Sequence, residues 1–293
     1  MATVYTHIAE SKRKTIFFVA IYIALITAIV WTAQAFYGFN PGFIVFAAIA
    51  SAVMSGISYF AGDKVALATS GAVEVTKADN PYIVNMIDNL AITSGLPVPK
   101  VYIIPDRAIN AFATGRDPQH ASIAVTQGAI EKLENEELEG VIAHEMSHVG
   151  NYDIRLMTIV IIMVGIISIL ADMLVRGSFF GGRGSDREGG NNLLAVAGFV
   201  LILLSPVIAE VIKLAVSRKR EYLADASAVL LTRYPEGLAR ALEKIRDENK
   251  PMAGASKATA HLYISNPFAK NKMSSLFSTH PPIEDRIKLL RGM

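Results

Sequence analysis

The sequence predicts a mainly α-helical membrane protein with four transmembrane helices and a cytoplasmic α+β domain that carries a small β-sheet. The first observation is composition: of 293 residues, 52% are hydrophobic and only 18% are charged, with a mean hydropathy of +0.38. These values are unusual for a wholly soluble protein. The second is the presence of four apolar stretches long enough to cross a bilayer, which takes about 20 helical residues. The third is a long segment of mixed composition between the second and third stretches.

The four apolar stretches form two hairpins. They cover residues 15–37, 41–61, 156–175 and 193–216. The first stretch follows a basic run, as a signal peptide would, but it is longer than a usual signal core and a second stretch follows at once. We therefore interpret it as an uncleaved anchor. The chain is therefore divided into an N-terminal membrane hairpin (1–61) and a second membrane hairpin (156–216). The cytoplasmic domain is formed in two parts, 62–155 and 217–293.

Basic residues predict the orientation in the membrane. Residues 12–14 before the first stretch and residues 218–220 after the fourth are all Lys or Arg, whereas the first hairpin loop, 38–40, is uncharged. Basic loops remain in the cytoplasm. Both termini and the domain between the hairpins are therefore expected on the cytoplasmic side, although three arginines in the loop 176–192 weaken this assignment.

The cytoplasmic segments predict helices and short strands. Residues 81–94 place apolar side chains at helical spacing and stop before Gly95 and two prolines. A second helix begins with Asn135 as its N-cap and acidic residues in its first turn, and continues, bent near Gly150, into the third apolar stretch. The fourth apolar stretch continues as a helix to about residue 231, before Pro235. Strands are expected at 100–104, 109–114 and 121–126, and further helices at 236–247 and 283–290.

The second helix carries the segment His144-Glu145-Met146-Ser147-His148. Positions four residues apart share a helix face, so both imidazoles can bind one metal ion while Glu145 lies beside it. The chain contains no cysteine, so any metal must be held by His, Asp or Glu. A catalytic zinc usually has three protein ligands, and Glu221 is the best candidate for the third. Asp225 lies on the same helix face and could orient a histidine ligand from behind.

This pattern predicts a hydrolase. One zinc ion per chain, held by His144, His148 and Glu221, would activate water and polarise a substrate carbonyl. Glu145 would act as general base and then as general acid. The metal could also be iron, which two histidines and one carboxylate can hold, but the helical arrangement with an adjacent base favours zinc.

Other candidate site residues each have a plainer alternative. The oxyanion of the tetrahedral intermediate needs a hydrogen-bond donor, for which His280 and Asn110 are candidates. His280 could instead be an ordinary turn histidine or an extra metal ligand. Asn110 could instead cap a turn. Arg286 could hold the substrate backbone, but a surface ion pair with Glu284 is favoured. Three further histidines lack ligand spacing and are expected at the surface or in packing: His7, His120 and His261.

The motifs together resemble the HtpX family of integral membrane zinc metalloproteases. The resemblance rests on the two double spans, on 110–115 (NAFATG), on the His144 motif, on Glu221 with Asp225, and on 279–282 (THPP). The zinc CAAX prenyl proteases are more distantly similar and have more spans. The resemblance implies a gluzincin-like domain at the cytoplasmic (inner) cell membrane that cleaves misfolded or damaged membrane proteins in quality control and stress response, with self-cleavage common.

Substrate binding and partners can also be considered from the sequence. Residues 122–126 alternate small polar and branched apolar side chains, which predicts a half-exposed strand. At a sheet edge, this strand could bind an extended peptide as a further strand; the alternative is an ordinary sheet strand. Nucleic acid is excluded as a partner, because the net charge is only +2 and no basic stretch is interleaved with aromatics. The oligomeric state stays open.

Three functions therefore remain in view. The first is a membrane-anchored quality-control endopeptidase, and the second is a processing or prenyl-protein protease of narrow specificity. The third is a zinc-binding membrane scaffold or transporter without catalytic activity. Glu145 counts against the third, because a structural site needs no base and usually closes its fourth coordination position.

Overall fold

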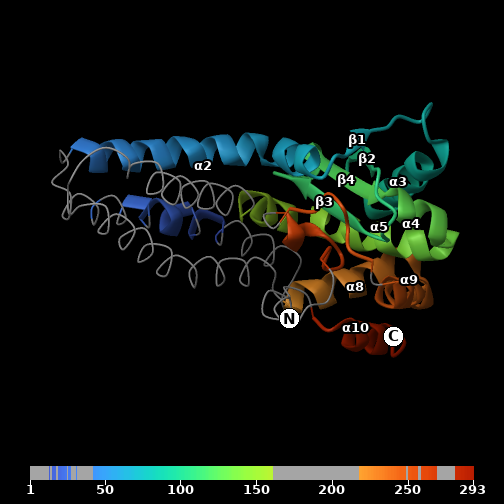
Figure 1. The fold of residues 1–293 in the computed structure, drawn as a ribbon. Helices are drawn as coiled ribbons and strands as arrows, with labels where there is room; N and C mark the ends of the chain where they lie inside the picture. The colour runs from blue at the N-terminus through green and yellow to red at the C-terminus, as the bar shows by residue number, and fades with distance from the viewer. Residues whose placement is uncertain are drawn as a thin grey trace, which may run out of the picture.

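The protein was analysed as a computed structural model, which describes residues 42–160, 218–248, 250–256, 259–268 and 281–293 together with a few residues between 13 and 31. Figure 1 shows a globular end, where the sheet and the shorter helices gather, and a long helix that projects from it. The described helices are α2 (Gly42–Thr69), α3 (Pro81–Ser94), α4 (Gln127–Lys132), α5 (Asn135–Gly150), α8 (Arg218–Thr232), α9 (Pro235–Glu248) and α10 (Ile283–Leu290). The strands are β1 (Val73–Glu74), β2 (Lys100–Ile104), β3 (Ala111–Gly115) and β4 (Ala121–Thr126).

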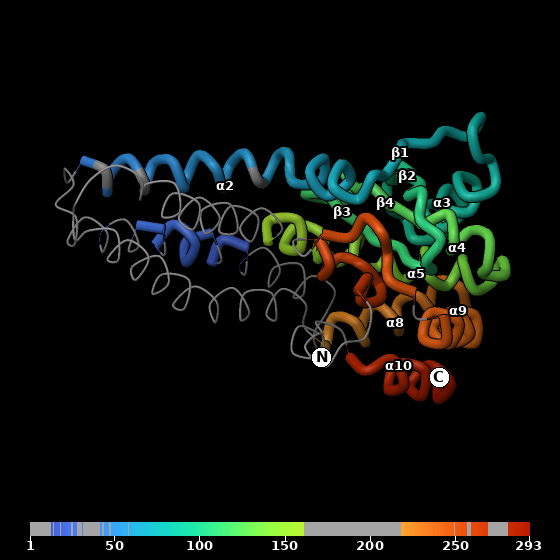
Figure 2. The backbone as a smooth tube through the Cα atoms, viewed as in Figure 1, coloured from blue at the N-terminus to red at the C-terminus, as the bar shows by residue number. Residues whose placement is uncertain are grey.

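The expected membrane spans are only partly covered by these residues. Helix α2, which extends away from the sheet in Figure 2, continues eight residues past the expected span end at 61, to Thr69. Among the described residues, no single helix meets the length and hydropathy needed to cross a membrane, and one pair, Ile44–Ile57 with Tyr59–Thr69, meets them together with a bend of 64°. Of the first span, the apolar helix Thr15–Ala24 is described. The span 193–216 and most of the span 156–175 lie outside the described residues.

The four strands form one sheet in the order β1-β2-β4-β3. Strand β4 pairs in parallel with β2 and antiparallel with β3, so it lies inside the sheet. Of the two alternatives for residues 122–126, the ordinary sheet strand is therefore confirmed, and the half-exposed strand that their alternation predicted is wrong. Strand β3 forms the edge beyond β4 in the described sheet.

The reason for this error is that both faces of the sheet are covered. In β4, Ile123 and Val125 pack into the main core with α3, α5 and α9, whereas Ala124 packs into a second cluster with the end of α2 and Tyr263. Even the polar residues of β4 are buried, with Ser122 at 3% and Thr126 at 0% exposure. Small hydroxyl side chains can be buried in this way when backbone groups satisfy them, and the Thr126 hydroxyl donates to the Asn110 carbonyl at 2.9 Å.

Helix α5 lies between the sheet and the pair α8 and α9. Its N-cap is Glu134, one residue before the expected Asn135. The Glu137 carboxylate accepts a hydrogen bond from the Glu134 amide at 2.8 Å and pairs with Lys244 of α9 at 2.7 Å. These contacts satisfy a backbone amide at the start of the helix and pair the buried carboxylate of Glu137.

Close contact between α5 and α9 depends on Gly140. A Cβ built at this position would lie 2.8 Å from the Leu238 backbone nitrogen and 3.0 Å from its Cα, so the helix backbones would have to separate. Gly140→Ala is expected to lower the free energy of unfolding by about 1–3 kcal/mol for overpacking, offset by up to about 1 kcal/mol of helix propensity. Thermal unfolding measures this, with Gly56→Ala as the control, because no atom of the described residues, apart from its chain neighbours and its own helix backbone, lies within 4 Å of a Cβ there. Equal stability of both variants would contradict the prediction.

The chain does not continue straight from α5 into the next helix. Helix α5 ends at Gly150, and Tyr152 has a φ of 60°, the left-handed region that non-glycine residues rarely adopt. The helical conformation resumes at Asp153. The break therefore lies at residues 151–152, just after the bend expected at Gly150.

Candidate metal centre

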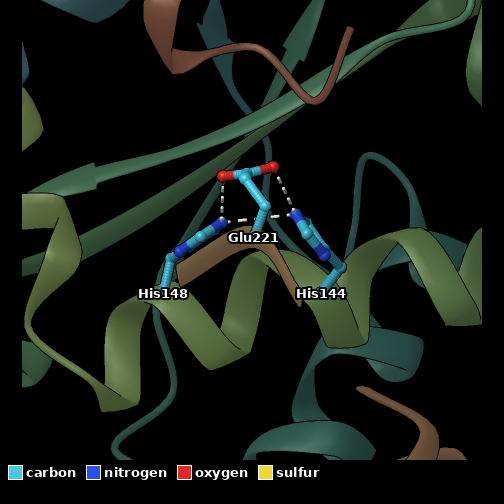
Figure 3. A group of neighbouring side chains, drawn as sticks. All are labelled: His144, His148 and Glu221. Atoms are coloured by element: carbon cyan, nitrogen blue, oxygen red, sulfur yellow. Dashed lines mark hydrogen bonds and ion pairs between the residues drawn. The ribbon is translucent and has the colours of Figure 1, made fainter. Parts of the chain in front are cut away.

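The structure brings His144, His148 and Glu221 together from two helices. His144 and His148 lie on successive turns of α5, and Glu221 reaches them from α8, as Figure 3 shows. The two Nε2 atoms are 3.2 Å apart. The Glu221 carboxylate oxygens lie 3.8 Å from His144 Nε2 and 3.5 Å from His148 Nε2. All three residues are buried, so few water molecules compete for these donors.

The size of this triangle fits a zinc ion. Zinc binds His nitrogen and carboxylate oxygen at about 2.0–2.2 Å with tetrahedral geometry, which places neighbouring ligand atoms about 3.3 Å apart. The three observed separations lie between 3.2 and 3.8 Å. Two neutral imidazoles and one carboxylate are also a common donor set for catalytic zinc, with one position left for water or substrate. The three residues are therefore a suitable metal site as they stand.

Glu145 lies beside this triangle and is 2% exposed. Burial raises its pKa, while the neighbouring His144 and His148 and the backbone amide of Ala113 in β3 act in the opposite direction. A carboxyl group whose pKa is raised toward neutrality is suited to taking up and releasing a proton. The arrangement therefore places a proton acceptor next to the metal site.

His144 is held from behind by Asp225 and Arg286. Its Nδ1 lies 2.9 Å from Asp225 Oδ1, and Arg286 donates to both Asp225 oxygens, at 2.9 and 2.6 Å. Burial would raise the pKa of Asp225, but the charge of Arg286 and the hydrogen bond of His144 lower it to about 2. Asp225 is therefore ionised at neutral pH, as expected of a carboxylate that orients a metal-binding histidine.

The surface ion pair favoured for Arg286 is wrong. Arg286 is 1% exposed, and its guanidinium points into the site, 3.7 Å from Glu221. A charge so deeply buried must be paired, and the paired carboxylates come from α8. The sequence pattern missed this contact because nothing in the chain near residue 286 indicates a partner 61 residues away.

His148 has a carboxylate behind it as well. Its Nδ1 lies 3.2 Å from Asp153 Oδ2, and Asp153 Oδ1 lies 3.4 Å from Arg220 Nε. The sequence pattern does not indicate Asp153, because it lies five residues after His148, and this spacing puts two residues on different faces of a continuous helix. The sequence does contain a signal that the helix is interrupted here, because Gly150 and Asn151 are two adjacent weak helix formers that permit a turn.

The remaining candidate residues either make contacts of their own or lie outside the described residues. Asn110 is 3% exposed, and its amide donates to the Ser265 carbonyl at 3.0 Å and to Met252 Sδ at 3.4 Å, which favours the structural alternative over the oxyanion donor. His261 packs in the interior, with Nε2 3.1 Å from the Met157 carbonyl. His120 pairs with Asp117 at the surface at 2.6 Å. His280 and His7 lie outside the described residues.

Zinc binding is expected to depend on pH through His148. Burial alone would lower the pKa of His148, but its hydrogen bond to Asp153 and the charges of Glu221, Asp153 and Glu145 raise it to about 9. Below this pH the metal must displace a proton. The apparent Kd for zinc should therefore fall by about tenfold for each unit of pH between about 6 and 9.

Competition with a chelator of known affinity measures this dependence, with proton release in weak buffer as a second readout. The raised pKa of His148 also affects the stability of the zinc-free protein. It stabilises the folded state below pH 6.5, and this contribution is lost as the pH rises through about 9. An apparent Kd that stays constant between pH 6 and 8 would contradict the prediction.

The site defines a class of protein. A zinc-sized triangle of nitrogen and oxygen donors on two helices, with a buried glutamate beside it, is typical of metal-dependent hydrolases. Comparison with known proteins gives the family. A sequence model of peptidase family M48 matches residues 77–293. The chain belongs to this family and is a metalloprotease.

Relatives that align with nearly the whole chain are named as HtpX protease homologues. The homologue from Dictyoglomus turgidum is 44% identical over 291 residues, which cover 99% of this chain and 95% of that protein. The homologue from Tropheryma whipplei strain Twist is 44% identical over 289 residues, covering 99% and 98%. The resemblance found from the motifs is therefore confirmed.

The solved structure of Ste24p from S. mikatae has a similar fold. The two structures match with a TM-score of 0.53 and 18% sequence identity, over 92% of this chain and 62% of Ste24p. This likeness concerns the fold alone. It supports the arrangement of helices around a small sheet that the described residues show.

Proposed function

We propose that this protein is a membrane-anchored zinc endopeptidase that cleaves misfolded or damaged membrane proteins at the cytoplasmic face of the cell membrane. The observation that carries the proposal is the position of Glu145 beside the triangle of His144, His148 and Glu221. A zinc-binding scaffold would have no use for a buried carboxyl group at this position.

The reaction follows from the roles that these residues can take. His144, His148 and Glu221 would hold a zinc ion, which supplies Lewis-acid activation of water and of the scissile carbonyl. Glu145 would take the proton of the attacking water on a carboxylate oxygen and deliver it to the nitrogen of the departing amine. Asp225 would keep His144 in the tautomer whose Nε2 faces the metal.

Strand β3 lies beside the catalytic base at the edge of the described sheet. Residues that alternate along β3 turn their backbone groups away from β4: the Ala113 amide meets the Glu145 carboxylate, and the Gly115 amide donates to Thr158 Oγ1 at 3.2 Å. These groups are already bonded, the Ala111 carbonyl accepts from the Ile264 amide, and all of β3 is buried. An extended peptide would therefore have to displace these contacts to add here, where it would run past the catalytic base. Binding through backbone hydrogen bonds makes little demand on sequence, which suits a protease that degrades many different proteins.

Anchoring in the membrane is part of the proposal. It is supported by the four apolar stretches and by the exposed apolar side chains of α2, including Phe46, Ile49 and Val53, which are 55–67% exposed. The two-part cytoplasmic domain, at 62–155 and 217–293, is proposed because basic residues flank the hairpins on that side. Protease digestion of inverted membrane vesicles tests this orientation: residues of α9 should be cleaved only when the cytoplasmic face is accessible.

The activity is tested with the full chain, purified in detergent with a chelator and then supplied with zinc. Two substrates separate the alternatives: an unfolded protein, and a farnesylated peptide with a C-terminal CAAX sequence. We expect zinc-dependent cleavage of the unfolded protein at several positions. Cleavage of the farnesylated peptide alone would instead indicate a prenyl-protein protease, and zinc binding without cleavage of either substrate would indicate a scaffold.

A further inference from the structure

We infer that Asp153, held by Arg220, is a positioning residue that fixes the ring of the second metal-binding histidine, His148. The inference rests on the metal site of the proposed function. Asp153 uses both carboxylate oxygens for this purpose: Oδ2 lies 3.2 Å from His148 Nδ1, and Oδ1 lies 3.4 Å from Arg220 Nε. The side chain therefore connects the end of α5 to the start of α8.

The contact is on the side of the ring that sets the tautomer. His148 Nε2 faces Glu221, at 3.5 Å, whereas Nδ1 faces Asp153. A carboxylate at Nδ1 accepts its proton, so that the lone pair is on Nε2, where a metal would bind. It also prevents the ring from rotating about its bond to Cβ, because the contact fixes the plane of the imidazole.

The chain interrupts a helix in order to make this contact. In an uninterrupted helix, residue 153 would lie about 140° around the axis from residue 148, because five residues turn through about 500°. Instead α5 stops at Gly150, and Tyr152 takes a φ of 60°. A left-handed conformation is unfavourable for a tyrosine, and such strain persists only where the surrounding structure requires it. The result is that Asp153 points back toward His148.

Burial explains why the pair must be complete. Asp153 is 2% and His148 4% exposed, and the side chain of Arg220 is 11% exposed. A buried carboxylate without a cation is costly, and Arg220 supplies the cation at Oδ1 while Oδ2 stays on the ring. Because Arg220 precedes Glu221 in the chain, α8 supplies one metal ligand and the support for another from adjacent residues.

The site then has the same arrangement behind each histidine. Behind His144 are Asp225 and Arg286, and behind His148 are Asp153 and Arg220. In each case an arginine holds an aspartate, and the aspartate contacts the Nδ1 atom of the ring. This repetition distinguishes Asp153 from an acidic residue that only caps the helix beginning there.

The test is the zinc affinity of the full chain in detergent, measured by competition with a chelator. Asp153→Asn keeps the size of the side chain, and Asp153→Ala removes it; both are expected to raise the Kd for zinc by about 10–100-fold, with the larger effect for alanine. The matched control is Asp117→Asn, which weakens another aspartate–histidine contact, with His120 at 2.6 Å, outside the site. Its Kd should equal that of the unchanged protein.

Two further readouts separate positioning from general stability. Arg220→Gln should weaken zinc binding in the unchanged protein and have no further effect in the Asp153→Ala background, because Arg220 acts through Asp153. In the cobalt-substituted protein, the visible absorption bands should shift for Asp153→Asn and not for Asp117→Asn. If Asp153→Ala does not fold, as judged by circular dichroism without metal, Asp153→Asn decides the matter.

The inference is overturned if Asp153→Asn, or a folded Asp153→Ala, binds zinc within twofold of the unchanged protein, or if the effects of Arg220→Gln and Asp153→Ala simply add. Failure of the proposed function looks different. In that case the unchanged protein binds zinc tightly and Asp153→Asn binds it weakly, but neither cleaves an unfolded protein. Weak zinc binding by Asp153→Asn therefore supports the inference whichever substrate the protease prefers.

Discussion

Glu145→Gln is expected to bind zinc as tightly as the unchanged protein and to lose cleavage by a factor of about 10²–10⁴, the usual contribution of a general acid–base group. The amide has nearly the same shape as the carboxyl group, so packing in this buried position is kept. Unlike the carboxylate, however, the amide cannot accept the proton of the attacking water. Zinc content and the rate of cleavage of an unfolded protein, measured on the same preparation, test both parts of the prediction.

Glu136→Gln is the matched control, because Glu136 is an exposed residue of the same helix and its substitution should leave both quantities unchanged. Loss of zinc from Glu145→Gln would show that this residue is needed to form the metal site. Retained activity would remove Glu145 from the reaction and with it the main support for an endopeptidase.

Arg286→Met is expected to destabilise the zinc-free protein by about 3–5 kcal/mol, the cost of leaving a buried ion pair with one partner. Arg286 is 1% exposed and bonds to both oxygens of Asp225, and it lies 3.7 Å from Glu221. Methionine fills a similar volume but leaves these carboxylates without their cation. Urea unfolding of the zinc-free protein, followed by circular dichroism, measures the loss.

The pH dependence of this loss can be predicted as well. Arg286 and His144 together lower the pKa of Asp225 from 3.8 to about 2, so the stability that these contacts supply is present above pH 3.8 and is lost as the pH falls toward 2. The difference between Arg286→Met and the unchanged protein should shrink over the same interval. Arg286→Lys should recover only part of it, because an ammonium group does not match both carboxylate oxygens.

Arg291→Met serves as the control for Arg286→Met. Arg291 ends the same helix and pairs with Glu236 and Glu243, but its side chain is 46% exposed. Pairs exposed to water contribute little, so stability should hardly change. Equal losses from both substitutions would mean that the burial of Arg286 has no energetic consequence.

Elements with a strong local pattern were predicted closely. The helices at 81–94 and 283–290 and the strands at 100–104 and 121–126 have the bounds that the sequence indicated. Hydrophobic periodicity and flanking Gly and Pro suffice for these. The two-residue strand β1 and the short helix α4 were missed, because such elements have too few residues to show a period.

The order of the strands could not be predicted. Alternating Ser, Ile, Ala, Val and Thr in residues 122–126 is compatible with a strand that has one exposed face, and equally with one covered on both faces by small polar side chains. The choice depends on α2 and on the chain around Tyr263, which are distant in sequence and supply the second cover.

The metal site was also predicted where it depends on local sequence and missed where it depends on the packing of distant segments. His144, Glu145 and His148 lie within one helical turn, so their relation follows from helix geometry. The structure also brings Glu221 and Asp225 to the expected neighbours. Asp153 was not recognised as part of the site, because its position depends on a left-handed turn. Arg286 was considered for substrate binding but assigned to a surface ion pair, because its true contacts depend on the packing of α10 against α8.

The origin of Arg286 in α10 has a consequence for biosynthesis. The helix with His144 and His148 leaves the ribosome before α8, and α10 follows after both, since chains are made and folded from the N-terminus. Until Arg286 has been translated, Asp225 and Glu221 have no guanidinium beside them, and His144 lacks a fixed support. A nascent chain with the complete zinc-hydrolase motif is therefore still without its finished metal centre, and the protease reaches its assembled form only after α10 has been translated.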